Sequence, residues 1–196
     1  MSDSTVRVVA LVGSLRRDSI NLRLARAAVE HAPAGVAVTV APALGDLPFY
    51  NEDIDPGTGA PGAVPEAVAG LRELVGAADA VLVVTPEYNG STPAALSNAI
   101  DWLSRPYGSG AIKDKPVGVI GAALGRHAGT WSRADTRKSL GVAGGTVLTE
   151  IDYGVRASGL EGALPGEVLA ELRAVVQKLA DAVPVSASRD TWARRD

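Results

Sequence analysis

The sequence predicts a doubly wound α/β fold, in which a five-stranded parallel sheet carries helices on both faces. Short β-branched apolar runs alternate about five times with stretches of helical period along the 196 residues. The stretches between successive runs are long enough for a helix, which is the connection that parallel strands need. Aromatic residues make up 4% of the chain although 46% of it is hydrophobic, so Val, Leu, Ile and Ala must build the core. Parallel sheets covered by helices usually have such a core.

The first half of the pattern begins with the apolar run 6–12, which Gly13 closes and which reads as a buried strand. Apolar residues recur at helical spacing over 21–31, and a second short β-branched run occupies 36–40. Residues 44–62 are rich in Pro, Gly, Asn and Asp, so we expect a long loop there. A loop of this length in a compact domain is uncommon, and it is usually functional or part of an interface.

The middle of the chain contains the strongest strand signal. Helical period returns over 63–77, and the run Ala-Val-Leu-Val-Val-Thr follows at 80–85. We expect a loop at 86–92 and a helix over 93–104, which has a proline in its first turn where a missing N–H costs little.

The last part of the chain adds two further strand–helix units. The predicted strand 116–121 is followed by a Gly-rich loop at 122–129 and a helix over 130–140. The final strand is predicted at 145–151 and the final helix at 165–183.

Five such strands suggest a three-layer sandwich with the strand order 2-1-3-4-5, known as the flavodoxin-like order. In this order the ligand crevice lies beyond the carboxyl ends of the strands beside the first one. The length fits one domain. We therefore expect a single domain over 1–183 and a polar C-terminal tail over 184–196.

Composition excludes several classes of function. Lys and Arg number 19 and Asp and Glu 22, which gives a net charge of −3, and no long basic run favours nucleic-acid binding. The chain has no cysteine and only two histidines, far apart, so we expect no metal site. The longest apolar runs fall far short of the roughly 20 residues that span a bilayer. The start of the chain also lacks the pattern of an export signal, so we expect a cytoplasmic protein without membrane contact.

The loop 13–21, between the first strand and the first helix, has the features of a phosphate site. A helix N-terminus offers unpaired N–H groups and a partial positive charge. Ser14, Ser19 and Asn21 add short polar donors, and Arg16 adds a guanidinium fork suited to phosphate oxygens. The loop lacks both the Gly-Lys-Ser/Thr ending of a P-loop and the Gly-x-Gly-x-x-Gly spacing of a dinucleotide site. The alternative is that Ser19 or Asn21 caps the helix and the arginines are solvated.

The loop that follows the third strand would open on the same crevice, because the strand order places that strand beside the first. Its backbone N–H groups and the Asn89 amide could pair with the edge of a planar heterocycle, against which Tyr88 could pack. For Trp102 on the following helix we favour ordinary packing. Asp101 is equally well explained as a surface or capping partner.

Together these two segments resemble the NADPH-dependent FMN reductase family, the flavodoxin-like quinone, azo-dye and chromate reductases. The similarity covers about residues 6–141. The residues that carry it are Gly13-Ser14-Leu15-Arg16 with Ser19 and Asn21, Pro86-Glu87-Tyr88-Asn89 with Ser91, Pro93, Asn98, Asp101 and Trp102, Leu47 to Asp53, Lys115-Pro116-Val117, and Gly121 to Arg126.

The resemblance implies a role for each loop. FMN would be the cofactor, with its phosphate held by Ser14, Arg16, Ser19 and Asn21. Its isoalloxazine ring would be lined by Pro86, Glu87, Tyr88 and Asn89. The loop 122–127, with Gly125 and Arg126, would approach the ring from the other side. The flavin would carry the chemistry, so no catalytic side chain is expected.

NADPH or NADH would be the reductant, and quinones, free flavin, azo compounds or similar molecules the acceptors. Arg17 or Arg126 could pair with the 2′-phosphate of NADPH, although a solvated Arg17 is as good an explanation. His127 either contacts a substrate or fills its loop.

The family is usually dimeric or tetrameric, so the resemblance implies a homodimer or homotetramer in which Tyr50 and Glu87 face a partner chain. Tyr50 is also expected to contact the substrate or NAD(P)H. The sequence departs from the family after Arg126, where the bulky Trp131 replaces a small-residue helix start. Trp131 could narrow the mouth for the substrate or repack the dimer.

The predicted function is an FMN-dependent NAD(P)H oxidoreductase. One alternative is a flavin-binding electron carrier or redox-sensing module without NAD(P)H turnover, although flavodoxins of that kind are more acidic and lack an arginine like Arg16. Another is an interaction subunit that has lost its cofactor, which the complete set of phosphate ligands disfavours.

Overall fold

The computed structural model describes residues 5–184 and contains one parallel sheet of five strands. The strands lie in the order β2-β1-β3-β4-β5, and each neighbouring pair is parallel. The predicted flavodoxin-like fold is therefore confirmed. The strands are β1 (Val6–Val12), β2 (Val36–Val40), β3 (Ala80–Thr85), β4 (Pro116–Ala123) and β5 (Thr146–Arg156).

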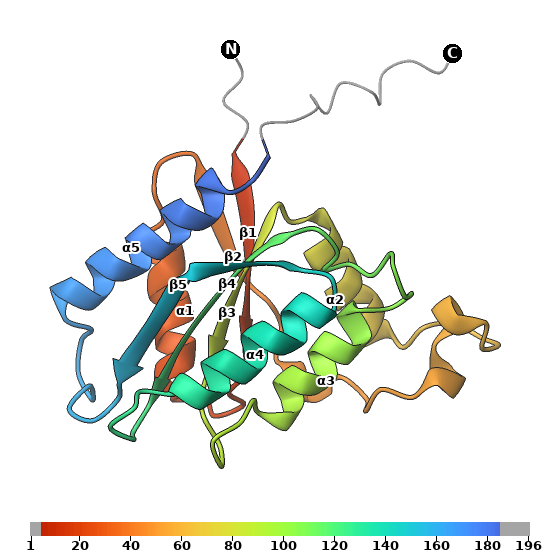
Figure 1. The fold of residues 1–196 in the computed structure, drawn as a ribbon, viewed down its shortest axis with the longest axis horizontal. Helices are drawn as coiled ribbons and strands as arrows, with labels where there is room; N and C mark the ends of the chain where they lie inside the picture. Colours follow the sequence, from red (N-terminus) through yellow and green to blue (C-terminus); the bar gives the residue numbers. More distant parts are fainter. Residues whose placement is uncertain (1–4, 185–196) are drawn as a thin grey trace.

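Helices cover both faces of the sheet (Figure 1). One layer holds α1 and α5, and the other holds α2, α3 and α4. Three short 3-10 helices lie within the long connection between β2 and α2. The helices are α1 (Ile20–Glu30), α2 (Glu66–Ala77), α3 (Ala94–Leu103), α4 (Thr130–Val142) and α5 (Gly166–Asp181), with η1 (Leu44–Asp46), η2 (Glu52–Ile54) and η3 (Pro56–Thr58).

The core consists of two apolar layers that the sheet separates. Successive side chains of a strand point to opposite faces. Val8 and Ala10 of β1 accordingly pack with α1 and α5, while Val9 and Leu11 pack with the other helices. All six residues of β3 are buried, because this strand is central and covered on both sides.

Several element boundaries differ from those predicted. The strand β5 continues to Arg156, five residues past the predicted end, and its register against β4 is irregular between Val117 and Val119. It lies at the edge of the sheet, where polar residues are tolerated, so its second half carries little apolar signal. The helix α2 begins at Glu66, three residues late, because Pro65 is its N-cap.

The carboxyl ends of β1, β3 and β4 meet at one edge of the sheet, so the loops that follow these strands are neighbours. None of the helices within residues 5–184 is long and apolar enough to cross a membrane. The predicted C-terminal tail lies outside the described residues from position 185 onward.

Candidate functional site

A cleft of about 940 Å³ lies at this edge of the sheet. Its walls come from the loops after β1, β3 and β4, from the start of α1, and from the segment between β5 and α5. Eight of the predicted site residues line it together: Ser14, Arg16, Arg17, Ser19, Asn21, Pro86, Glu87 and Tyr88, and Gly125 adds a ninth. Asn89, Arg126, His127 and Tyr50 are not among the lining residues.

The loop between β1 and α1 presents uncommitted donors to the cleft. The side chains of Ser14, Arg16 and Arg17 make no hydrogen bond or ion pair with any residue of the described chain. Both arginines are exposed, and Ser14 is partly buried. The first turn of α1 contains no acidic residue, and the nearest carboxylate along the chain, that of Asp18, is exposed just before the N-cap Ser19. The arrangement is suited to binding an anion.

Ser19 and Asn21 are occupied within the protein. Ser19 is the N-cap of α1, and its Oγ accepts a hydrogen bond from the Asn21 backbone N–H at 3.2 Å. The Asn21 side chain is buried, donates from Nδ2 to the Ala122 carbonyl at 3.0 Å, and accepts at Oδ1 from the Ala122 N–H at 2.8 Å. Ser19 therefore caps the helix, as the alternative to phosphate binding predicted, while Asn21 joins two walls of the cleft.

The start of the loop after β3 is fixed by the first turn of α4. The carboxylate of Glu87 accepts a hydrogen bond at Oε2 from the Ser132 N–H at 3.0 Å. The Ser132 hydroxyl donates to the Pro86 carbonyl at 2.7 Å and also contacts the Thr85 hydroxyl at 2.9 Å. Because a carboxylate at a helix N-terminus is favourable, Glu87 stabilises α4 as well as lining the cleft.

The same loop continues into a tight turn over 88–91. Asn89 has a φ of 53° and Gly90 a φ of 70°, which is the geometry that an Asn-Gly pair favours. The Tyr88 side chain is half exposed at the wall of the cleft, while the turn carries Asn89 away from it. At the far end of the turn, the Ser91 hydroxyl donates to Asp135 on α4 at 2.6 Å.

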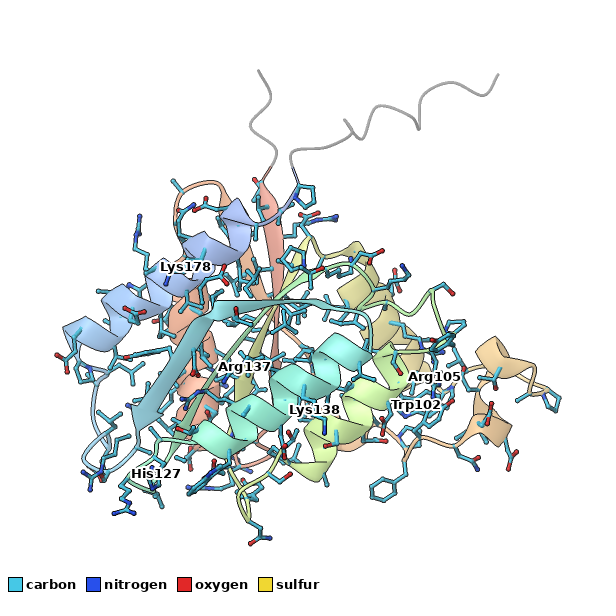
Figure 2. The ribbon with its side chains drawn as sticks, viewed as in Figure 1. Trp102, Arg105, His127, Arg137, Lys138 and Lys178 are labelled. Carbon is cyan, nitrogen blue, oxygen red and sulfur yellow. The ribbon has the colours of Figure 1, made fainter. Side chains whose placement is uncertain are left out.

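The loop after β4 brings only its first part to the cleft. Gly125 is a lining residue, whereas the exposed Arg126 and His127 lie beyond it. Arg126 Nε donates to His127 Nε2 at 2.9 Å, and the His127 ring lies 4.9 Å from that of Trp131. Trp131, at the start of α4, therefore lies in a surface cluster with His127. Figure 2 shows His127 near that end of the helix.

A buried arginine that the sequence did not reveal holds this loop in place. Arg133 of α4 donates from Nε to Asp152 at 2.7 Å, and from Nη1 to the Ala128 carbonyl. Burial alone would raise the pKa of Asp152, but hydrogen bonds from Arg137 and Arg133 outweigh it and lower the pKa. Gly154 leaves the space in which the Arg133 guanidinium lies.

Tyr50 and Trp102 belong to a separate cluster beside the long connection. Figure 2 labels Trp102 and Arg105 of this cluster. Their rings meet edge to face at 4.9 Å, and Trp102 is fully buried, as ordinary packing predicts. The Trp102 Nε1–H donates to the Pro48 carbonyl at 2.8 Å, and Arg105 Nε donates to the Tyr50 hydroxyl at 3.2 Å. Within one chain, Tyr50 is therefore a structural residue of the long connection.

A buried ion pair anchors the same connection. The Asp55 side chain is fully buried, and its two oxygens accept from Arg72 at 3.0 and 2.8 Å. The Arg72 Nε also donates to the Trp102 carbonyl at 3.1 Å. The hydrogen bonds from Arg72 lower the pKa of Asp55 against the opposing effect of burial. Sequence patterns give no sign of this pair, since its members are 17 residues apart.

The fold is that of a doubly wound α/β protein, and the cleft lies at the switch point of the sheet, where such proteins bind their ligands. Comparison with known families identifies the class: residues 6–158 match the model of NADPH-dependent FMN reductases, and the chain belongs to that family. This result also confirms the resemblance stated from the two loop motifs.

Three relatives illustrate the family. A quinone reductase of Pseudomonas putida is 44% identical over 133 residues, which is 68% of each chain. An NAD(P)H-dependent FMN reductase of Pseudomonas aeruginosa is 39% identical over 140 residues, or 71% of each chain. The solved structure of FerB, a flavoenzyme NAD(P)H:(acceptor) oxidoreductase from Paracoccus denitrificans, superposes with a TM-score of 0.79 at 31% identity, covering 91% of this chain and 97% of FerB.

The residues present fit FMN. A phosphate needs several donors at one point, and the first loop supplies the Ser14 hydroxyl, the Arg16 guanidinium and the N-terminus of α1. A Cβ on Gly13 would lie 3.2 Å from both Leu96 and Pro86, so glycine lets the first loop approach the second. Family membership and this donor set confirm the predictions of an FMN-dependent oxidoreductase and of NAD(P)H as reductant, ahead of the electron-carrier alternative.

Proposed function

We propose that this chain uses bound FMN to transfer electrons from NAD(P)H to a flat acceptor, with quinones as the first class to test. The observation that carries this proposal is the meeting of an arginine-bearing loop and the Pro86–Tyr88 loop in one cleft of about 940 Å³. FMN, when bound, supplies the hydride and electron chemistry. The protein then has to bind FMN, orient the reductant and the acceptor against it, and enclose the reacting groups.

At the phosphate end, we assign Ser14 and Arg16 as direct ligands. Their side-chain donors are uncommitted, and α1 begins beside them. We assign Ser19 an indirect role: it caps α1 and so fixes where the helix starts. Asn21 acts as a positioning residue, because both polar ends of its side chain are bonded to Ala122.

At the ring end, we assign Pro86, Glu87, Tyr88 and Gly125, which line the cleft from two sides. The hydrogen bond between Glu87 and Ser132 holds this wall in one position, as hydride transfer requires reacting atoms at about 3–3.5 Å. Contacts of the flavin with Asn89 or Arg126 would need these exposed residues to move toward the cleft.

The mouth of the cleft is apolar enough to accept a planar molecule. The side chains of Tyr88 and Leu124 are both lining residues, and they are 50% and 74% exposed. Exposed apolar groups at a cleft commonly mark a ligand site. We propose that NAD(P)H and the acceptor use this opening in turn.

We further propose a homodimer or homotetramer in the cytoplasm. The support is a set of large exposed apolar side chains on and near α3 and α4, among them Tyr107 and Val142, which are 90% and 83% exposed. A partner that covers this side could also bring Tyr50 or His127 toward a flavin. Analytical ultracentrifugation of the purified protein tests the assembly, and a monomer at micromolar concentration would contradict it.

The activity is tested with protein purified and then saturated with FMN. We expect one FMN per chain, and oxidation of NADPH or NADH that depends on an added quinone. Stopped-flow mixing with NADPH should bleach the flavin within the turnover time, which a carrier would not do. Protein that does not take up FMN would contradict the proposal, as would a flavin that stays oxidised on mixing.

A further inference from the structure

One wall of the cleft comes from the segment between β5 and α5, which has no regular secondary structure. We call residues 157–162 of this segment the strap. Four of its residues line the cleft: Ala157, Leu160, Glu161 and Gly162. The strap extends past residue 158, where the match to the family model ends. Its role therefore has to be read from the contacts of this chain.

The strap has few hydrogen bonds of its own. The Ala157 N–H donates to the Ala123 carbonyl at 2.9 Å, and the Leu160 N–H donates to the Ala157 carbonyl at 3.3 Å. No other backbone–backbone hydrogen bond within residues 5–184 involves positions 158–162, most of which are exposed. Gly159 has a φ of 85°, in the left-handed region that glycine favours. A segment with so few bonds opens easily unless a side chain holds it.

Arg23 of α1 is the side chain that holds the strap. Its Nη1 donates to the Leu160 carbonyl at 2.5 Å, and its Nη2 donates to the Gly162 carbonyl. One guanidinium group therefore binds two carbonyls of the strap, which suits its planar fork of donors. Both terminal nitrogens of Arg23 are used in this way, in contrast to those of the uncommitted Arg16.

These bonds place the strap at the end of the cleft to which we assign the FMN phosphate. Arg23 lies two residues after Asn21, near the N-terminus of α1. The strap begins at Ala157, which is bonded to Ala123, and the neighbouring Ala122 pairs with Asn21. The start of α1, the end of β4 and the strap are thus joined around one end of the cleft.

We propose that Arg23 is a positioning residue for the cofactor: it holds the strap against α1, closes the phosphate end of the cleft and slows the release of FMN. This inference rests on the proposed function, in which FMN stays bound between turnovers. The strap acts sterically and not by attraction, because its only charged residue, Glu161, has the same sign of charge as a phosphate.

The first test measures the strap in the FMN-free protein. A protease specific for glutamate cleaves the bond between Glu161 and Gly162, which lies between the two carbonyls that Arg23 binds. Cleavage of a folded protein follows the population of the locally opened state. For Arg23→Ala we expect cleavage at this bond, identified by fragment mass, to be about tenfold faster, because two charge-assisted hydrogen bonds are lost.

The second test measures the release of FMN from the loaded protein by the recovery of flavin fluorescence after dilution. For Arg23→Ala we expect the dissociation rate constant to rise about tenfold. Arg23→Lys keeps the charge without the fork, so its rate constant should lie between those of the wild type and of Arg23→Ala.

The matched control for both tests is Arg26→Ala. Arg26 lines the same cleft from the same helix, but it is exposed and makes no hydrogen bond or ion pair within residues 5–184. Its loss removes the same charge from the cleft and leaves the strap in place. We therefore expect Arg26→Ala to change both rates far less than Arg23→Ala does.

The outcomes separate this inference from the proposed function. Faster release of FMN with unchanged cleavage at Glu161 would make Arg23 a direct ligand of FMN and overturn the role of the strap. Unchanged release, or an equal increase in Arg23→Ala and Arg26→Ala, would overturn it as well. If Arg23→Ala accelerates both cleavage and release, but the wild-type protein does not oxidise NADPH or NADH, the strap is supported and the proposed function is contradicted.

Discussion

The Asn21 side chain pairs with the backbone of Ala122 in both directions, donating to its carbonyl at 3.0 Å and accepting from its N–H at 2.8 Å. The two residues are 101 positions apart, yet the bond pair joins the first turn of α1 to the end of β4. Both residues are buried. The two cleft walls to which we assign the FMN phosphate and part of the flavin ring are therefore joined by this side chain.

Replacing Asn21 by Ala should destabilise the protein by about 2–4 kcal/mol, because two buried backbone groups of Ala122 lose their partners. Chemical denaturation of the FMN-free protein measures this loss, and FMN titration should show weaker binding as the two walls separate. Asn51→Ala is the control, since Asn51 is exposed and, within residues 5–184, its side chain bonds only the nearby Asp53 N–H. Equal stability of the two variants would mean that the Asn21 pair contributes little.

Replacing Arg16 by Ala should weaken FMN binding without unfolding the protein. The Arg16 side chain is exposed and has no partner within residues 5–184, so its loss leaves no buried group unpaired. A charge-assisted hydrogen bond contributes about 1.5–3 kcal/mol, which corresponds to a roughly 10- to 150-fold rise in Kd. Flavin fluorescence titration measures the change. Arg16→Lys retains the charge but loses the guanidinium fork, so its Kd for FMN should lie between those of the wild type and of Arg16→Ala. An FMN affinity that is unchanged in Arg16→Ala would show that Arg16 does not bind FMN.

The sequence was sufficient for features that depend on local pattern. Strands β1, β2 and β3 have the predicted bounds, because each is an uninterrupted apolar run that ends at a turn-forming segment. The loops 13–21 and 86–92 were expected to open on one crevice because their polar residues follow directly after two of these strands. Parallel topology then required the loops to meet.

Features that depend on distant partners escaped sequence reasoning. Arg133 and Asp55 are charged, and charged residues are normally exposed, but each is buried against a partner 15 or more positions away. The pairing of Asn21 with Ala122 likewise has no sequence signature, because its partner is a backbone group. Tyr50 was assigned to the substrate from resemblance alone, and its contacts with Trp102 and Arg105 depend on the path of the long connection.

Gly154→Ala should destabilise the protein through Arg133. A Cβ at Gly154 would lie 2.6 Å from Arg133 Cζ and 2.8 Å from the Ala128 carbonyl oxygen, too close for either to remain in place. Because Arg133 is buried and paired with Asp152, its movement should cost about 1–3 kcal/mol. Thermal unfolding measures the effect. The control is Gly76→Ala in α2, where a Cβ meets nothing within 4 Å and should be neutral or stabilising; a similar response of the two variants would contradict this account.

The ion pair of Asp55 and Arg72 should make the protein sensitive to acid. The hydrogen bonds from Arg72 hold the folded-state pKa of Asp55 below its value of about 3.9 in an unfolded chain. The stabilisation is therefore fully present above that unfolded pKa, and it is lost as the pH falls through the folded pKa. At neutral pH the ion pair therefore contributes its full stabilisation to the folded protein.

Asp55→Asn removes the charge and should cost about 3 kcal/mol or more at pH 7, because it leaves the largely buried Arg72 without its counter-ion. As the pH falls below about 4, the wild-type protein loses this stabilisation and the variant does not, so their unfolding free energies should converge. Urea denaturation between pH 7 and pH 3 measures both curves. Asp114→Asn is the matched control, since Asp114 pairs with Lys113 at the surface and should change stability by less than about 1 kcal/mol. A difference between wild type and Asp55→Asn that stays constant down to the lowest pH would show that Asp55 does not titrate as the ion pair requires.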